Sequence, residues 1–228
     1  MTNFPFDIIG FDLDGTLFDT SEDLTDALNH ALGLLERPPL SVAAVRPMIG
    51  RGGKYMLQQG LEASGGCDPE VLERTYPELL AYYGDNIARA THAFPGLGAA
   101  MDALDARGAK IAIVTNKSES LAVKLVAELA LDHRFACVIG GDTMGPDSRK
   151  PSPAGIREMI RRCGGGRAAF VGDSIFDIQA AKNAGIPSIA VSFGFLMQPV
   201  EELVADAVID HFDELVPRLE MLGGKPGA

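Results

Sequence analysis

Short apolar runs bounded by turn residues recur along the chain and predict the strands of a sheet. They occupy residues 6–11, 110–114, 136–139, 168–171 and 188–191. Helical segments at 118–130, 153–163 and 174–184 separate the later runs, and each opens with a capping residue or proline. This alternation is typical of a parallel sheet wrapped by helices. We therefore expect an α/β fold with a doubly wound, Rossmann-like parallel sheet.

The stretch between the first two predicted strands is too long for a single crossover and holds several helical patterns. One apolar face consists of Leu24, Leu28, Leu32 and Leu35, and another of Leu72, Tyr76, Leu79, Leu80 and Tyr83. We expect an inserted helical cap domain at 17–87, with 1–16 and 88–228 forming the α/β core. Pro77 lies inside the second pattern and should kink that helix or restart it near Tyr76.

The first predicted strand ends in two aspartates, within the string FDIIGFDLDGT. Side chains two residues apart in an extended segment share a face, so Asp12 and Asp14 should project together from the carboxyl end of the strand. Ligands bind at that end in open α/β sheets. The alternative interpretation is structural, because Asp14-Gly15 between apolar residues also favours a hairpin turn.

Polar residues also follow the later strands. Thr115 and Asn116 come after the second strand, Lys150 lies in the loop after the third, and Asp173 and Asp177 follow the fourth. Each alone fits a loop or helix-capping role. A parallel sheet brings the carboxyl ends of its strands together, however, so these side chains should converge with Asp12 and Asp14 on one crevice.

Such a crevice suits phosphoryl transfer assisted by Mg²⁺, since carboxylate oxygens are ligands that this ion prefers and the ion reverses the local field. Asp12 can act as the nucleophile. Asp14 can protonate the leaving oxygen and afterwards deprotonate the attacking water. Thr115 and Lys150 can hold the non-bridging phosphoryl oxygens. We expect an aspartyl-phosphate intermediate.

These residues resemble the four motifs of the haloacid dehalogenase-like hydrolases, in order, over nearly the whole chain: Asp12 to Thr16, Thr115, Lys150, and Gly172 to Asp177. The resemblance implies that Asp12 is the nucleophile and Asp14 the acid/base. It also implies that Mg²⁺ is held by the Asp12 side chain, the Asp14 backbone carbonyl and Asp173, with Asp177 supporting the site. Within the family, the strings VRPMIGRGGKYML, VTNK and VGDSIFDIQAAKNAGIP look like those of phosphoglycolate phosphatases, which implies a small phosphate monoester such as 2-phosphoglycolate as substrate.

The inserted segment contains a basic, glycine-rich turn. Gly50 to Gly53 would present backbone N–H groups near a helix start, beside Arg46, Arg51 and Lys54, so the turn could bind a second anionic group of the substrate. We predict substrate contacts for Arg46 and Lys54 in addition to Thr115, Asn116 and Lys150. A flexible basic turn on a solvated face is an equally good interpretation.

Composition limits the remaining choices. The net charge of −11 argues against nucleic-acid binding and anionic membranes. No apolar run approaches the roughly 20 residues of a membrane span, and the N-terminal sequence lacks signal-peptide features, so we expect a cytoplasmic protein acting on a small phosphorylated metabolite, as a monomer or homodimer. The three cysteines and four histidines show no metal-site spacing. A sugar-phosphate phosphomutase and a catalytically silent phosphate-binding module are the alternatives to a phosphatase.

Overall fold

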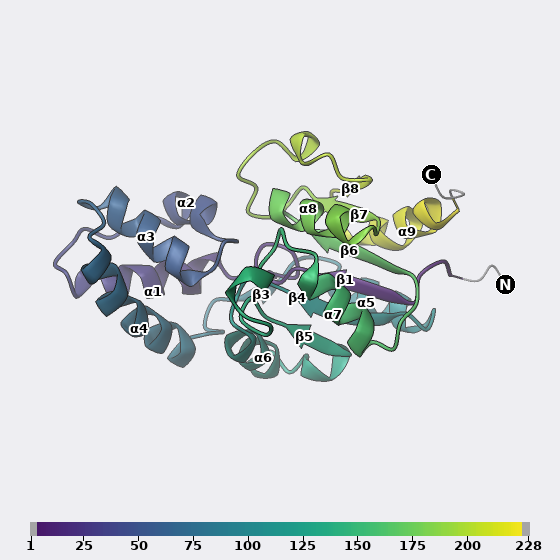
Figure 1. Cartoon of the computed structure of the whole chain (residues 1–228), viewed down its shortest axis with the longest axis horizontal. Helices are drawn as coiled ribbons and strands as arrows, with labels where there is room; N and C mark the ends of the chain where they lie inside the picture. Colours follow the sequence, from purple (N-terminus) through teal and green to yellow (C-terminus); the bar gives the residue numbers. More distant parts are fainter. Residues whose placement is uncertain (1–3, 225–228) are drawn as a thin grey trace.

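The core of the fold is a six-stranded parallel sheet. A computed structural model describes residues 4–224, and its strand order is β5-β4-β1-β6-β7-β8. The strands are β1 (Ile8–Phe11), β4 (Lys110–Val114), β5 (Cys137–Ile139), β6 (Ala168–Gly172), β7 (Ser188–Val191) and β8 (Ala207–Ile209). Every pair is parallel, and β1 lies in the centre between β4 and β6 (Figure 1). The hairpin interpretation of Asp14-Gly15 is therefore wrong, because within residues 4–224 the partners of β1 are β4 and β6, both distant in sequence.

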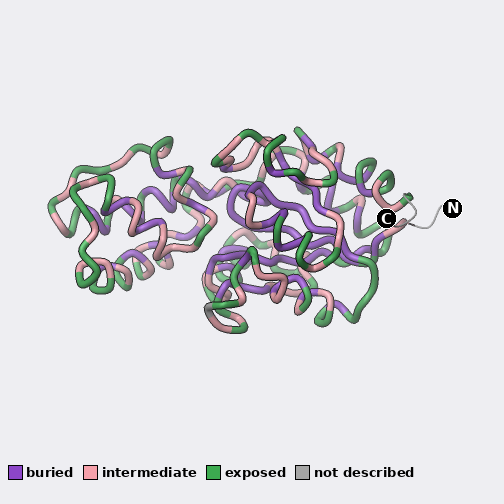
Figure 2. The backbone as a smooth tube through the Cα atoms, turned by 45° about the horizontal axis from the view of Figure 1, so that its top comes forward, coloured by how far each residue is buried: buried purple, intermediate pink, exposed green. Residues whose placement is uncertain are grey.

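Helices cover both faces of this sheet. Alternate residues of a strand enter separate apolar clusters, as Ile8 and Ile9 do. The cluster of Ile8 includes residues of α7 (Ala154–Arg162) and α8 (Ile175–Ala184), and that of Ile9 includes α5 (Leu97–Asp105), α6 (Glu119–Glu128) and α9 (Leu215–Gly223). Figure 2 shows the buried backbone concentrated in the strands between these layers. The doubly wound sheet is confirmed.

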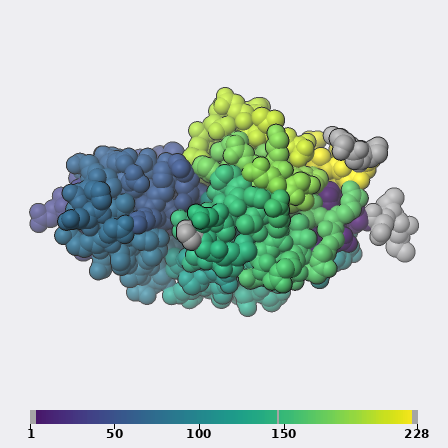
Figure 3. Space-filling view, in the orientation of Figure 1, coloured from purple at the N-terminus to yellow at the C-terminus, as the bar shows by residue number. Residues whose placement is uncertain are grey.

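A helical group, which we call the cap, stands at one end of the core (Figure 1). It contains α1 (Ser21–Gly33), α2 (Val42–Val45), α3 (Gly53–Ala63) and α4 (Pro69–Asp85), with the 3-10 turn η1 (Arg46–Met48). A two-stranded antiparallel ribbon of β2 (Phe18–Asp19) and β3 (His92–Ala93) links it to the core. Figure 3 shows the atoms of the cap, in blue, lying against one side of the core.

The predicted apolar faces of the cap are the ones that the helices bury. Leu24, Leu28 and Leu32 are buried with Leu79 and Tyr83. The residues of these faces that remain half-buried are Leu35, Leu72, Tyr76 and Leu80. The predicted restart near Tyr76 is wrong, because α4 runs without a break from Pro69 to Asp85. Pro77 lies on its exposed side, where water can satisfy the carbonyl that loses its hydrogen bond.

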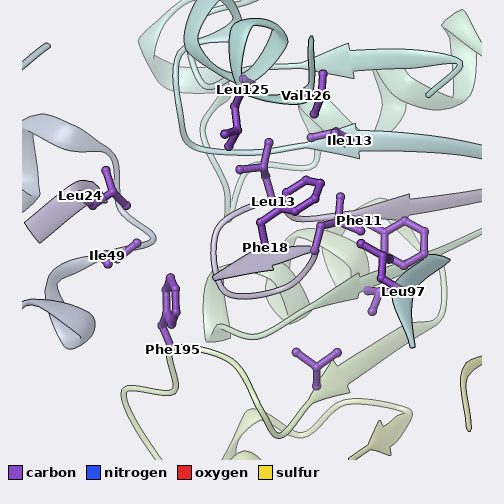
Figure 4. Close-up of a cluster of buried hydrophobic side chains, with 14 of the residues drawn as sticks. Phe11, Leu13, Phe18, Leu24, Ile49, Leu97, Ile113, Leu125, Val126 and Phe195 are labelled. Atoms are coloured by element: carbon purple, nitrogen blue, oxygen red, sulfur yellow. The ribbon is translucent and has the colours of Figure 1, made fainter. Parts of the chain in front are cut away.

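One continuous apolar cluster joins the cap to the sheet. Leu24 and Ile49 come from the cap, Leu13 and Phe18 follow β1, and Phe195 follows β7; all are buried (Figure 4). This shared packing fixes the cap beside the carboxyl ends of the central strands. The predicted division into a cap at 17–87 and a core at 1–16 and 88–228 stays a prediction. Residues 1–3 and 225–228 of the predicted core lie outside the described part of the chain. Within residues 4–224 no helix has the length and apolar composition to cross a membrane.

Candidate active site

The loops after β1, β4, β5 and β6 bring polar side chains together at the carboxyl edge of the sheet. Asp12 directly follows β1 and its backbone N–H donates to Val171 O at 2.9 Å, which continues the pairing with β6. Thr115 follows β4 in the same way, with its N–H 2.9 Å from Ile139 O of β5. Backbone pairing of the strands is therefore enough to place Asp12 and Thr115 at the same edge of the sheet, without any side-chain contact.

Three buried carboxylates form a cluster at this edge. Asp12, Asp173 and Asp177 each place a carboxylate oxygen within 4.8 Å of the others. Lys150 Nζ lies 2.7 Å from Asp12 Oδ1 and 2.6 Å from Asp177 Oδ1. Burial raises the pKa of Asp12 to about 7 against the opposing attraction of Lys150, and the charge of Asp177 adds to the rise. Burial, followed by the charges of Asp177 and Asp12, also raises the pKa of Asp173 well above its ordinary value.

The cluster fits a hard divalent cation. Three carboxylates and one ammonium leave an excess of negative charge, and oxygen donors of this kind suit Mg²⁺. Asp12 Oδ1 is buried and accepts no hydrogen bond of regular geometry from residues 4–224, although the Lys150 ammonium is near. Asp177 is more fully used, since its Oδ1 accepts from Lys150 and its Oδ2 accepts the Ser174 N–H at 3.0 Å in a capping box. This arrangement suits Asp177 to support the cluster.

Gly15 lets the chain turn tightly around Asp173. Its φ of +82° is unfavourable for other residues, and a Cβ there would lie 2.2 Å from Asp173 Oδ2. That oxygen accepts the N–H of Phe195 at 2.7 Å, while Oδ1 accepts the Thr16 hydroxyl at 3.3 Å. The glycine of the DxDGT motif thus serves the close approach of two strand ends.

Asp14 occupies a different environment from Asp12. The Thr20 hydroxyl donates to Asp14 Oδ1 at 2.7 Å, and Lys117 Nζ lies 2.9 Å from both carboxylate oxygens. Both Asp14 and Lys117 are buried. The site therefore contains two carboxylates with distinct partners, an arrangement that allows them different chemical roles. Sequence reasoning did not give Lys117 a role; its only signal was its place after Thr115 and Asn116 in the string VTNK.

Asn116 connects the cap to the loop that carries Lys150. Its Nδ2 donates to Gly50 O at 3.0 Å and to Lys150 O at 3.3 Å, and its Oδ1 accepts the Lys150 N–H at 2.8 Å. Thr115 is also buried, and its hydroxyl accepts the Lys117 N–H at 3.2 Å. These contacts hold Lys150 and the Gly50 turn in place.

A cavity of about 280 Å³ lies between the cap and the core. The core contributes Asp12, Asp14 and Thr115 to its lining, and the cap contributes mainly apolar side chains. The lining residues are Asp12, Asp14, Leu24, Ile49, Gly50, Gly52, Gly53, Met56, Tyr76, Leu79, Leu80, Tyr83, Thr115, Asn116, Lys117, Ser118, Leu121, Asp142 and Arg149. Of the carboxylate cluster, Asp12 reaches this cavity, where it lies with Asp14 and Thr115.

The basic side chains of the cap that were predicted to contact substrate do not line this cavity. Arg46 pairs with Asp19, bonds to Ser21 and lies over the Phe195 ring. Lys54 pairs with Glu73, with both side chains largely exposed. Neither is among the residues that line the cavity, and Arg51 stacks on Tyr55. A substrate contact by Arg46 or Lys54 remains a prediction, and in this arrangement both groups are already paired.

Comparisons with known proteins agree with one another. A family model described as haloacid dehalogenase-like hydrolase matches residues 9–191. A phosphoglycolate phosphatase of Mesorhizobium japonicum is 41% identical over 93% of this chain and 94% of its own length, and that of Agrobacterium fabrum is 37% identical over 96% and 95%. A crystal structure described as a predicted phosphoglycolate phosphatase from Haemophilus somnus superposes with a TM-score of 0.87 at 28% identity, covering 94% of this chain and 98% of that one.

Proposed function

This chain belongs to the haloacid dehalogenase-like hydrolase family and is an enzyme, and we propose that it is a Mg²⁺-dependent phosphatase that hydrolyses a small phosphate monoester through an aspartyl-phosphate intermediate. The observation that carries the proposal is the meeting of two buried aspartates with different partners. Asp12 lies in the carboxylate cluster with Lys150, and Asp14 lies two residues on with Lys117 and Thr20.

In the first half-reaction an Asp12 carboxylate oxygen attacks phosphorus. The bond between phosphorus and the ester oxygen breaks, and the leaving oxygen takes a proton from Asp14. In the second, water attacks the phosphorus of the acyl phosphate and gives its proton to Asp14. This step returns the Asp12 carboxylate and releases inorganic phosphate.

Asp14 is suited to both steps because the Thr20 hydroxyl orients one of its oxygens, which reduces the reorganisation needed during each turnover. Lys150 and Thr115 would hold the non-bridging oxygens of the phosphoryl group, and burial makes each of these contacts stronger than it would be in water. Asp12, the Asp14 backbone carbonyl and Asp173 would hold Mg²⁺, with support from Asp177. When bound, this ion would offset the charge shared by the carboxylates and the phosphoryl group.

We assign 2-phosphoglycolate as the best candidate substrate. The relatives from Mesorhizobium japonicum and Agrobacterium fabrum are named phosphoglycolate phosphatases, and the cavity of about 280 Å³ suits a small ester. The division into a core of 1–16 and 88–228 and a cap of 17–87 belongs to the same proposal, with the cap closing the cavity over the reacting group.

Phosphate release from a set of phosphate esters tests this function. With Mg²⁺ present, kcat/KM for 2-phosphoglycolate should exceed that for p-nitrophenyl phosphate and for nucleoside monophosphates. Release should stop in EDTA and return when Mg²⁺ is added. Full activity in EDTA would exclude the metal dependence, and equal kcat/KM values would exclude the substrate assignment.

A further inference from the structure

Lys117 is a buried cation that the reaction steps above do not use. Its Nζ contacts both oxygens of Asp14 at 2.9 Å, and its side chain is only 6% exposed. Burial alone would lower the pKa of Lys117, but the Asp14 carboxylate and the Tyr83 hydroxyl raise it well above its ordinary value. Lys117 is therefore a fixed positive charge.

The backbone of Lys117 is as firmly held as its side chain. Its N–H donates to the Thr115 hydroxyl, and its carbonyl accepts the Gly141 N–H at 2.8 Å. These contacts anchor the residue to the ends of β4 and β5. A long, flexible side chain that starts from a rigid backbone and ends in a two-oxygen contact restricts the orientation of its partner carboxylate.

The cap covers the other side of this ammonium. Tyr83 of α4 is buried, and Lys117 Nζ lies 4.6 Å from the centre of its ring. A cation at this distance from an aromatic face is attracted to it. The Tyr83 hydroxyl makes no hydrogen bond of regular geometry with residues 4–224, so the contact that the geometry shows is the one between Lys117 Nζ and the face of the ring.

We propose that Lys117 is the positioning residue for the acid/base Asp14, and that Tyr83 of the cap holds Lys117 in place. The chain of contacts runs from cap to core: α4 covers Lys117 with an aromatic ring, and Lys117 fixes both oxygens of Asp14. The Asp14 carboxyl, which transfers the proton, is then fully oriented only while α4 lies against the core. This inference rests on the proposed phosphatase function.

The leaving group of the substrate provides the test. An alkyl oxygen needs a proton as it departs, whereas p-nitrophenolate is stable without one. The value of kcat/KM reports the steps up to phosphoryl transfer, so it isolates the acid role of Asp14 from its later role as base. Three substrates suffice: 2-phosphoglycolate, ethyl phosphate and p-nitrophenyl phosphate.

For Lys117→Met we expect the ratio of kcat/KM for each alkyl ester to that for the aryl ester to fall by about tenfold to a hundredfold, a part of the usual contribution of a general acid. Tyr83→Leu should lower the same ratio less, and Tyr83→Phe should lower it least because it keeps the ring face. Both values in a ratio come from one preparation, so the fraction of folded enzyme cancels. Tyr82→Leu is the matched control, since Tyr82 on the same helix stacks on His30 outside the cavity and its ratio should not change.

Two results would overturn the inference while wild-type activity remained intact. An unchanged ratio in Lys117→Met would show that Asp14 needs no positioning by Lys117. A fall in kcat/KM of Lys117→Met for 2-phosphoglycolate, with kcat/KM for ethyl phosphate unaffected, would show that Lys117 binds the carboxylate of the substrate instead. Failure of the wild-type enzyme to hydrolyse any of the three esters would exclude the proposed function itself.

Discussion

Without a metal, the carboxylate cluster should make the native protein less stable as the pH rises. Burial raises the pKa of Asp12 in the folded protein to about 7, above its ordinary value of 3.8. Between these two values the folded chain keeps a proton that the unfolded chain has lost, so folding stability falls with increasing pH across this window. The shift of Asp173 has the same direction.

The structure gives the size of the effect. A shift of about three pKa units corresponds to about 4 kcal/mol at roughly 1.4 kcal/mol per unit, which is a large part of the stability of a typical domain. Asp12→Asn removes this charge, and Lys150 keeps Asp177 as a partner. In EDTA we therefore expect the variant to be more stable than wild type at pH 8, by up to about 4 kcal/mol, and similar to it near pH 4.

Urea unfolding of both proteins between pH 4 and pH 8, with EDTA or with Mg²⁺, measures these differences. Mg²⁺ should stabilise wild type at pH 8 much more than Asp12→Asn, because the variant offers a weaker ligand. The reasoning would be refuted if Asp12→Asn were less stable than wild type at pH 8 in EDTA, or if the difference between the two proteins did not depend on pH.

Three further substitutions test other parts of the site. Lys150→Ala should lower kcat/KM by about a hundredfold or more, because it removes the ammonium that balances Asp12 and the phosphoryl oxygens; an unaffected kcat/KM would show that Lys150 takes no part in the reaction. Asn116→Ala should lower stability by about 1–3 kcal/mol in urea unfolding and also lower kcat, since it leaves the buried Lys150 N–H and Gly50 carbonyl unpaired. A rise in KM with no change in kcat or stability would instead indicate a direct substrate contact. Lys54→Met should change KM for 2-phosphoglycolate less than about twofold, because Lys54 pairs with an exposed Glu73; a rise specific to 2-phosphoglycolate over p-nitrophenyl phosphate would establish the contact predicted from sequence.

The sequence predicted the central elements because their signals are local. The strands β1, β4, β5, β6 and β7 are apolar runs between turn residues, and the predicted positions are confirmed to within two residues. The edge strand β8 and the ribbon of β2 and β3 were not predicted. The strand β8 has three residues, and β2 and β3 have two each, so their apolar runs are too short to be recognised; β2 also pairs with a strand more distant in the chain than any short run reveals.

The same distinction applies to the site. A parallel sheet gathers the carboxyl ends of its strands, so the meeting of Asp12, Asp173 and Lys150 could be inferred from topology alone. The partners of individual cations could not. Arg46 finds Asp19 across the cap, and Lys117 finds Asp14 between two strand ends, because packing brings together residues that no sequence spacing relates. The effect of Pro77 could not be inferred either, since the sequence does not show that this side of α4 faces solvent.

The identity of the phosphorylated residue is the most direct test of the account. The enzyme would be mixed with excess 2-phosphoglycolate and Mg²⁺, quenched in acid within milliseconds, digested and mapped by mass spectrometry. We predict one phosphoryl group on the peptide that contains Asp12, carried by that aspartate and absent from Asp12→Asn. A phosphoryl group on any other residue, or turnover at a wild-type rate without a covalent phosphoenzyme, would contradict the mechanism.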